Sequence, residues 1–192
     1  MFRWIVLLVL VANIGISGYF RHKARQSGET IGRREEGALM IVMRLVFTLP
    51  LLLSILAFVI HPSWMAWSSV AVPEWVRWIG GVLGAGIVPF TYWVFRTIGR
   101  NISETVLTKE THELVTDGPY RWVRHPLYTV GTLLLTAISL LTANWFIGGM
   151  TLLAVVMIVL VVIPREEANL IEAFGDAYHG YKKRTGMLLP GL

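Results

Sequence analysis

The sequence predicts an all-α integral membrane protein, a bundle of about five transmembrane helices followed by a cytosolic amphipathic helix. Of its 192 residues, 55% are hydrophobic and 15% charged, and the mean hydropathy is +0.61. These values lie outside the range of soluble domains, so the excess apolar residues must face lipid. A bilayer core of roughly 30 Å needs about 20 apolar residues per helix, and five apolar runs of about that length occur.

The runs divide the chain into two parts. Residues 1–95 hold three predicted spans, at about 4–20, 39–60 and 75–95. The first run could be a signal peptide, but it is longer than a typical signal core and lacks a small-residue cleavage site, so a span is favoured. Residues 96–192 form the predicted catalytic region, with a cytosolic loop at 96–126, a helical hairpin at 127–163 and a tail helix at 164–192. Three residues separate the two hairpin runs, which makes these helices antiparallel neighbours.

The basic residues predict the orientation. Arg and Lys are plentiful after the first run, after the third and in the tail, whereas the connection at 61–74 and the hairpin tip contain none. Fourteen of the seventeen basic residues therefore fall on one face, which the positive-inside rule makes cytosolic. We expect the N-terminus outside and the C-terminus and the site in the cytosol.

Composition also excludes several classes of site. The chain has no Cys, which removes disulfides and thiolate chemistry. Its net charge of +5 is explained by the basic residues that gather on one side of the membrane, so no nucleic-acid partner is expected. No third ligand stands at a helical spacing from His112 or His125, so no metal is expected. Gly80 and Gly84 lie inside an apolar run with no strand before it, which favours close helix packing over a dinucleotide loop.

Two cytosolic blocks carry the candidate chemistry. Residues 111–128 read THELVTDGPYRWVRHPLY, with histidines, arginines and aromatic residues next to the start of a span. Pro126 suits the first helical turn and places His125 at a helix N-terminus, where an anionic group binds well. The alternative is an interfacial aromatic belt with arginines on lipid phosphates.

The second block, PREEANLIEAFGDAYHGY at 164–181, supplies the opposite charge. Leu170, Phe174, Tyr178 and Tyr181 form an apolar helical stripe. The acids near Pro164 suit a first helical turn, and a tight hairpin would place Arg165, Glu166 and Glu167 beside His125.

Together, GPYRWVRHPLY, a two-span hairpin and REEANLIEAFGDAYHGYKKRTGMLLP closely resemble the isoprenylcysteine carboxyl methyltransferase and phospholipid methyltransferase superfamily. The resemblance covers about 101–190 and implies S-adenosylmethionine bound at the cytosolic ends of the last spans. It implies catalytic roles for Arg165, Glu166 and Glu167, Arg165 aligning the methyl acceptor. The implied cofactor contacts are His112, Glu113, Leu114, Val115, Tyr120, His125, Pro126, Leu127, Tyr128 and Glu167.

The methyl acceptor is expected to be lipid-like or prenylated. A carboxylate already carries its nucleophilic charge and needs only alignment and partial dehydration. A phospholipid amine would first need a general base such as a histidine or glutamate. The carboxylate is favoured and the amine remains the alternative. A third reading is a non-enzymatic lipid-binding scaffold, in which Tyr120, His125 and Glu167 would be individually dispensable.

Overall fold

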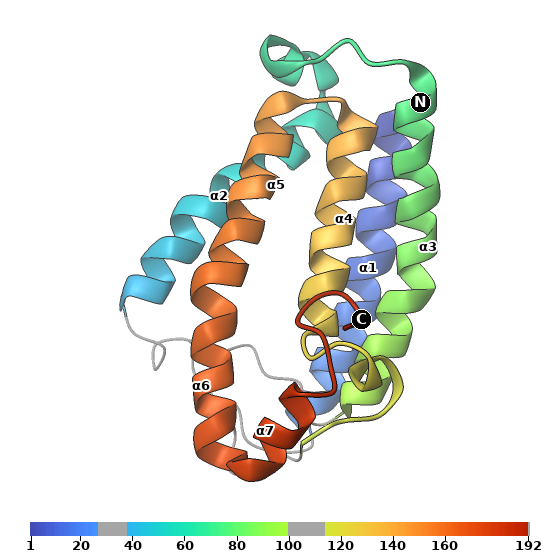
Figure 1. The fold of residues 1–192 in the computed structure, drawn as a ribbon. Helices are drawn as coiled ribbons and strands as arrows, with labels where there is room; N and C mark the ends of the chain where they lie inside the picture. Colours follow the sequence, from blue (N-terminus) through green and yellow to red (C-terminus); the bar gives the residue numbers. More distant parts are fainter. Residues whose placement is uncertain (27–37, 100–113, 192) are drawn as a thin grey trace.

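The computed structural model describes residues 1–26, 38–99 and 114–191, and helices account for most of them (Figure 1). The long helices begin with α1 (Phe2–Gln26), α2 (Ala38–Ile60) and α3 (Glu74–Ile98). The C-terminal half holds α4 (Pro126–Thr142), α5 (Trp145–Met157), α6 (Ile163–Phe174) and α7 (Asp176–Lys182). Shorter segments are the 3-10 helices η2 (Pro62–Ser68) and η4 (Gly118–Arg121) and the π-helix η5 (Ile158–Val162). Within the described ranges the only β pairing is two isolated bridges.

The helices α1, α3 and α4 form the tightly packed side of the bundle, and α5 and α2 flank it (Figure 1). The α3–α4 contact is the most extensive, and α1 packs against both of these helices. The α4–α5 turn and η2 lie at one end of the bundle, and α7 lies at the other (Figure 1). The predicted helical hairpin is therefore present, and α4 links the two ends.

Within the described parts of the chain, three helices are long and apolar enough to cross a bilayer: Phe2–Gln26, Glu74–Ile98 and the continuous helix Trp145–Phe174. Large apolar side chains on them face outward, such as Leu8 at 69%, Val82 at 73% and Leu160 at 69% exposure. Apolar surface of this extent is expected to face lipid. The chain is thus an all-helical integral membrane protein.

Glycines set the distance between α3 and its neighbours. A Cβ on Gly80 would lie 2.7 Å from the Ala137 carbonyl oxygen, and one on Gly84 would lie 3.0 Å from a Val9 methyl. The α3 backbone can approach α4 and α1 this closely only because these positions lack side chains. The predicted packing role is confirmed, although the two glycines contact different helices.

The turn between α4 and α5 is closed by specific polar contacts. Ala143 adopts a left-handed conformation (φ 49°) and ends α4. Asn144 caps α5 by accepting a hydrogen bond from the Ile147 amide at 3.1 Å. Its side-chain amide donates to the Met65 carbonyl at 3.0 Å and to the Ser68 hydroxyl at 2.8 Å, both in η2. Because Asn144 is only 4% exposed, these bonds fix η2 against the hairpin.

The tail differs from the expected single helix over 164–192. The helix runs through Pro164 without a break. The wider π turn of η5 lies just before Pro164 and lets α5 continue into α6. Gly175, at φ 50°, instead breaks the tail between α6 and α7. After Lys182 the chain runs back toward α4 without forming a helix (Figure 1). The sequence reading missed the break because the apolar stripe continues across it.

Candidate functional site

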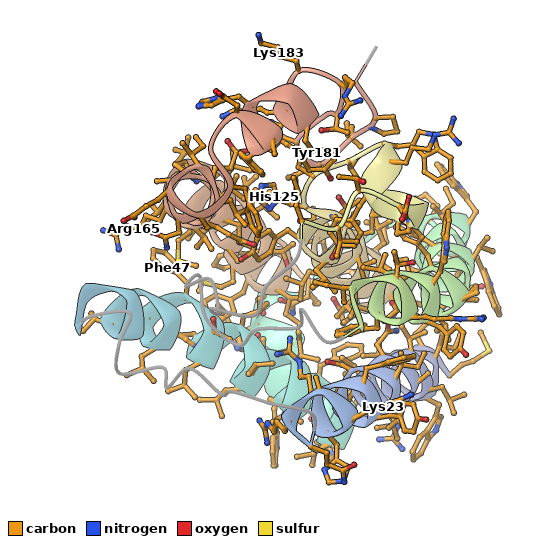
Figure 2. All side chains as sticks on the ribbon, turned by 90° about the horizontal axis from the view of Figure 1, so that it is seen from below. Lys23, Phe47, His125, Arg165, Tyr181 and Lys183 are labelled. Carbon is orange, nitrogen blue, oxygen red and sulfur yellow. The ribbon has the colours of Figure 1, made fainter. Side chains whose placement is uncertain are left out.

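The site forms where the N-terminus of α4 meets the first turns of α6, at the α7 end of the bundle. Figure 2, viewed from this end, shows His125 inside the ring of helices and Tyr181 nearby. His125 is the residue before Pro126, the first residue of α4, and is only 4% exposed. The predicted meeting of the two sequence blocks is therefore present in the structure.

Glu167 is the centre of a buried ionic cluster. Its Oε1 accepts a hydrogen bond from Arg124 Nε at 2.8 Å and lies 3.4 Å from His125 Nε2. Its Oε2 accepts from the ammonium group of Lys182 on α7. The Glu167 and Arg124 side chains are 7% and 8% exposed, whereas that of Lys182 is 42% exposed. Glu167 thus ties α6 to the start of α4 and to α7.

The cluster keeps Glu167 ionised. This residue lies on α6, beyond the apolar part of the helix, which ends at Ile163. Burial alone would raise the pKa of its carboxyl, but hydrogen bonds from His125, Lys182 and Arg124 outweigh burial and hold the pKa well below its usual range. At neutral pH the carboxylate therefore balances cationic partners and is not placed to act as a proton donor.

Glu166 has a different environment, although it is adjacent in sequence. Its Oε2 accepts a hydrogen bond from the Tyr128 hydroxyl at 2.7 Å, and its Oε1 lies 3.9 Å from His125 Nδ1. Its side chain is 28% exposed, four times as much as that of Glu167. The His125 and Tyr128 rings have centroids 5.7 Å apart. Glu166, His125 and Tyr128 therefore present a carboxylate and two rings at a partly open position.

The returning tail supports this end of α4. The Arg124 amide donates to the Gly186 carbonyl at 2.8 Å, and the His125 amide donates to the Met187 carbonyl at 3.1 Å. The Thr129 hydroxyl donates to the Leu188 carbonyl at 2.7 Å. The tail thus satisfies backbone donors ahead of α4 that would otherwise be buried unpaired.

Arg124 adds side-chain contacts to the tail. Its Nη1 donates to the Lys182 carbonyl at 3.1 Å and also to the Thr185 carbonyl. One guanidinium therefore bridges α6, α7 and the segment after α7.

Tyr120 and Tyr181 position the turn before α4. Gly118, at φ 56°, opens η4, and a Cβ there would lie 2.7 Å from the Thr97 hydroxyl. The buried Tyr181 hydroxyl donates to the Tyr120 carbonyl at 2.7 Å. Burial raises the pKa of Tyr181 to about 12 and that of Tyr120 well above its ordinary value. Both phenols therefore stay neutral at physiological pH.

Tyr178 is the one buried phenol at the site whose hydroxyl has no hydrogen-bond partner among the described residues. It is 1% exposed and interacts electrostatically with Glu167, Glu166 and Arg124. Burial raises its pKa further above the ordinary value, so the hydroxyl remains a donor. A buried hydroxyl without a partner is costly, and a bound polar ligand could supply that partner.

The other predicted residues lie at varying distances from this centre. Val115 and Leu127 are half-buried and pack with the core cluster that contains Tyr120, Leu114 is half-buried, and Pro126 is buried. Arg165 is exposed and lies on the outer side of α6, away from His125 (Figure 2). His112 and Glu113 lie outside the described residues. No group of three potential metal-ligating side chains occurs in the described ranges.

Sequence reasoning missed several residues at the site, among them Arg124, Lys182, Tyr178, Tyr181 and Thr185. Arg124 was visible beside His125, but its pairing with Glu167 depends on the fold. The sequence did contain a signal for Arg124: the Glu167 carboxylate, if buried, needs a cationic partner, and Arg124 stands next to His125. Nothing in the sequence indicated that Lys182 or the Thr185 carbonyl would join it.

The fold and the site thus define a membrane-embedded helical bundle with a buried ionic cluster at one end. Its middle, residues 81–172, matches the family model described as the isoprenylcysteine carboxyl methyltransferase (ICMT) family. Over that stretch the chain is similar to the ICMT family.

Individual relatives agree with this assignment. Protein-S-isoprenylcysteine O-methyltransferase of Mus musculus is 34% identical over 96 residues, which cover 49% of this chain and 34% of the relative. A methanethiol S-methyltransferase of Bradyrhizobium diazoefficiens is 40% identical over 72 residues, 37% of this chain and 24% of the relative. Protein YpbQ of Bacillus subtilis is 26% identical over 142 residues, 72% of this chain and 78% of the relative. The chain thus matches only about a third of the mouse protein.

A solved structure shares the fold. A eukaryotic intramembrane Ras methyltransferase, ICMT, superimposes with a TM-score of 0.56 at 23% sequence identity, over 83% of this chain and 54% of the other. At this identity the likeness concerns the fold alone. It supports the membrane helical architecture.

Proposed function

We propose that this protein is an S-adenosylmethionine-dependent membrane methyltransferase that acts on an anionic carboxylate or thiolate acceptor at the end of the bundle where α4 begins. One observation carries the proposal. Two blocks some 40 residues apart, each with the family pattern, meet as the Glu166–His125–Tyr128 group beside the Glu167 cluster. Two of the relatives named above have names that specify methyl transfer to oxygen or to sulfur, and they support this reaction class over amine methylation.

The residues present suit the proposed cofactor. S-adenosylmethionine carries a sulfonium, an amino group and a carboxylate. The 28% exposed carboxylate of Glu166 and the neighbouring rings of His125 and Tyr128 suit the cationic groups. The N-terminus of α4 suits the anionic group. The Tyr178 hydroxyl, which has no hydrogen-bond partner in the described part of the chain, is a further donor. Among the two glutamates we assign the cofactor contact to Glu166, because Glu167 is committed to Arg124, Lys182 and His125.

The chain's own contribution to the reaction is positioning and the exclusion of water. When bound, S-adenosylmethionine supplies an electrophilic methyl group that an acceptor attacks in line. Glu166 would hold the cationic part of the cofactor, and Glu167 helps to position the His125 ring, with its Oε1 3.4 Å from His125 Nε2. No proton transfer is needed if the acceptor arrives as an anion. A site at the membrane surface strips water from that anion and increases its reactivity.

Arg165 is proposed to align the acceptor. It occupies the same turn of α6 as Glu166 but is exposed on the outer side of the helix (Figure 2). A cation there can meet an anionic acceptor that approaches from the lipid surface. We expect Arg165→Gln to raise KM for the acceptor several-fold, because an exposed ion pair contributes up to about 1 kcal/mol of binding free energy. The affinity for the cofactor should stay unchanged. An equal loss of affinity for cofactor and acceptor would contradict this role.

The proposal includes five spans, with the N-terminus outside and the site in the cytosol. Besides the three long helices, the apolar helices Leu45–Ile60 and Pro126–Thr142 run alongside them. At about 1.5 Å per residue, α4 is about 25 Å long, enough to cross most of a bilayer core. Placement of the basic residues supports the orientation. The amphipathic tail helix is now assigned to α6 and α7, separated at Gly175.

The test is a titration of the detergent-purified protein with S-adenosylmethionine and S-adenosylhomocysteine by calorimetry. We expect saturable binding that Glu166→Gln and His125→Ala each weaken by about tenfold or more. Glu172→Gln is the matched control, because Glu172 is an exposed carboxylate on α6. It should bind like the unmodified protein. Absence of binding in folded protein would refute the proposal and favour a lipid-binding scaffold.

The acceptor class is tested separately with radiolabelled methyl donor. Vesicle-embedded protein is offered an S-prenylated cysteine, a small thiol or an aminophospholipid. Alkali releases a methyl ester as volatile methanol but leaves thioethers and methylamines intact. We expect label on the carboxylate or the thiol. Label on the aminophospholipid alone would overturn the acceptor assignment and establish the amine alternative.

A further inference from the structure

A cavity lies at the opposite end of the bundle from the candidate site. It has a volume of about 590 Å³, and its lining includes Arg3, Phe58, Ser69, Arg77 and Thr142. Thr142 is the last residue of α4, whereas His125 precedes its first, so the length of α4 separates the two sites. Its volume lies within the range of small-molecule sites, roughly 300–1,000 Å³.

Two guanidinium groups line this cavity. Arg77 is held in place, since its Nε donates to the Leu141 carbonyl at 2.9 Å and its guanidinium carbon lies 3.8 Å from the centroid of the Phe2 ring. Its two terminal nitrogens are the remaining donors. Arg3 lies over the Trp4 ring at 4.7 Å, and its Nη1 is 3.5 Å from the Ile60 carbonyl.

The charge of this lining is unbalanced. Among the described residues that line it, none is Asp or Glu. The acidic neighbour of Arg77 is Glu74, which is exposed at the first turn of α3. A cavity lined by two guanidinium groups suits an anion that accepts several hydrogen bonds, and phosphate is such an anion.

These two arginines also stand apart in the sequence. Of the thirteen Lys and Arg residues that the structure describes, ten lie toward the end of the bundle that holds the candidate site, and Arg44 lies near the start of α2 at that same end. The remaining two, Arg3 and Arg77, lie at the opposite end, and both line the cavity. Membrane topology disfavours basic residues at that end, so their convergence calls for a specific ligand.

Tryptophans place the cavity at the depth of lipid headgroups. Trp side chains on four elements surround this end and are 45% to 64% exposed: Trp4, Trp64, Trp67, Trp75, Trp78 and Trp145. Exposed tryptophans gather at the interface between hydrocarbon and headgroups. The phosphate available at that depth belongs to phospholipid.

We propose that this cavity binds the phosphate of an anionic phospholipid from the leaflet opposite the candidate methyltransferase site. The guanidiniums of Arg3 and Arg77 contact the phosphate, and the acyl chains follow the apolar surface of α1 and α2. The site is separate from the proposed reaction and does not depend on it.

The experiment is native mass spectrometry of protein extracted from vesicles made of equal parts phosphatidylglycerol and phosphatidylcholine. We expect retained phosphatidylglycerol on the unmodified protein and about tenfold less on Arg77→Gln or Arg3→Gln, because each loses a charge-assisted contact. Lys23→Gln is the control, since Lys23 is exposed at the other end of α1 (Figure 2). It should retain lipid normally.

Arg77 also donates a hydrogen bond to the Leu141 carbonyl, so Arg77→Gln could lose lipid because the protein is misfolded. Arg3→Gln distinguishes the two causes, because the Arg3 contact with the protein is longer and contributes less to folding. Unchanged retention in a folded Arg3→Gln variant would overturn the proposal, and so would equal loss in Lys23→Gln. A titration with inorganic phosphate distinguishes the source of the anion. Displacement of the lipid by millimolar phosphate would show a soluble-anion site and overturn the assignment to phospholipid.

Discussion

Replacement of Glu167 by glutamine tests whether the buried ionic cluster holds the candidate site together. Glu167→Gln keeps the shape of the side chain and removes its charge. Arg124 is only 8% exposed, so the substitution leaves its guanidinium buried without an ionic partner. Breaking one half of a buried ion pair costs about 3–5 kcal/mol. For a protein of this size, 1 kcal/mol corresponds to about 2–4 °C in Tm, so we expect a fall of roughly 6–20 °C.

Lys182→Gln provides the contrast. Lys182 contacts the same carboxylate, but its side chain is 42% exposed. Solvent screens this pair, and exposed pairs contribute about 0–1 kcal/mol. We therefore expect a Tm decrease of at most about 4 °C. Glu167→Gln removes the carboxylate and all of these contacts, whereas Lys182→Gln removes only the contact of the carboxylate with its most exposed partner, so the comparison separates the buried contacts from the exposed one.

The assay is thermal unfolding in detergent, followed by intrinsic fluorescence, together with limited proteolysis of the segment after α7. Arg124 also donates to the Lys182 and Thr185 carbonyls, so loss of the cluster should expose that segment to protease before global unfolding. Equal Tm shifts for the two variants would refute the reasoning. So would a Glu167→Gln protein with unchanged Tm and an unchanged cleavage pattern.

Three further substitutions test other contacts by thermal unfolding. Tyr181→Phe removes the buried hydrogen bond to the Tyr120 carbonyl and should cost about 1–3 kcal/mol; no change in Tm would show that the bond is dispensable. Asn144→Ala removes the α5 cap and two buried bonds to η2 and should cost about 2–5 kcal/mol, with a loss under 1 kcal/mol contradicting the clamp. Gly80→Ala would place a methyl 2.7–2.9 Å from α4 and should destabilise by about 1–3 kcal/mol or more. Gly86→Ala, where nothing lies within 4 Å, is its control and should be neutral or slightly stabilising.

Sequence reasoning reached the parts of the fold that follow from local patterns. Apolar run length located the cores of the helices, and three intervening residues sufficed to predict the α4–α5 hairpin. Pro126 fixed the start of α4 because proline suits a first helical turn. The helices extend beyond the expected spans, as α1 does from 4–20 to Phe2–Gln26, because a helix continues into water after its apolar segment ends.

The details that escaped prediction depend on distant contacts. An apolar stripe cannot report the left-handed Gly175, because periodicity continues across the break. Similarly, Glu166 and Glu167 have different partners because successive residues of α6 are rotated by about 100°. The partners themselves depend on the positions of Arg124 and Tyr128. Those positions are set by the returning tail, which has no periodic signal of its own.

The pairing of Gly186, Met187 and Leu188 with the start of α4 also sets the order in which the site can assemble. During synthesis, α4 and its preceding turn are made about 60 residues before this segment. Until the segment emerges, the Arg124 and His125 amides lack their native acceptors. The membrane helices can therefore insert while the site is still open, and the candidate site becomes ordered only after this segment has been made. A nascent chain that lacks residues 186–188 would therefore have the helices around the candidate site without the contacts that order it.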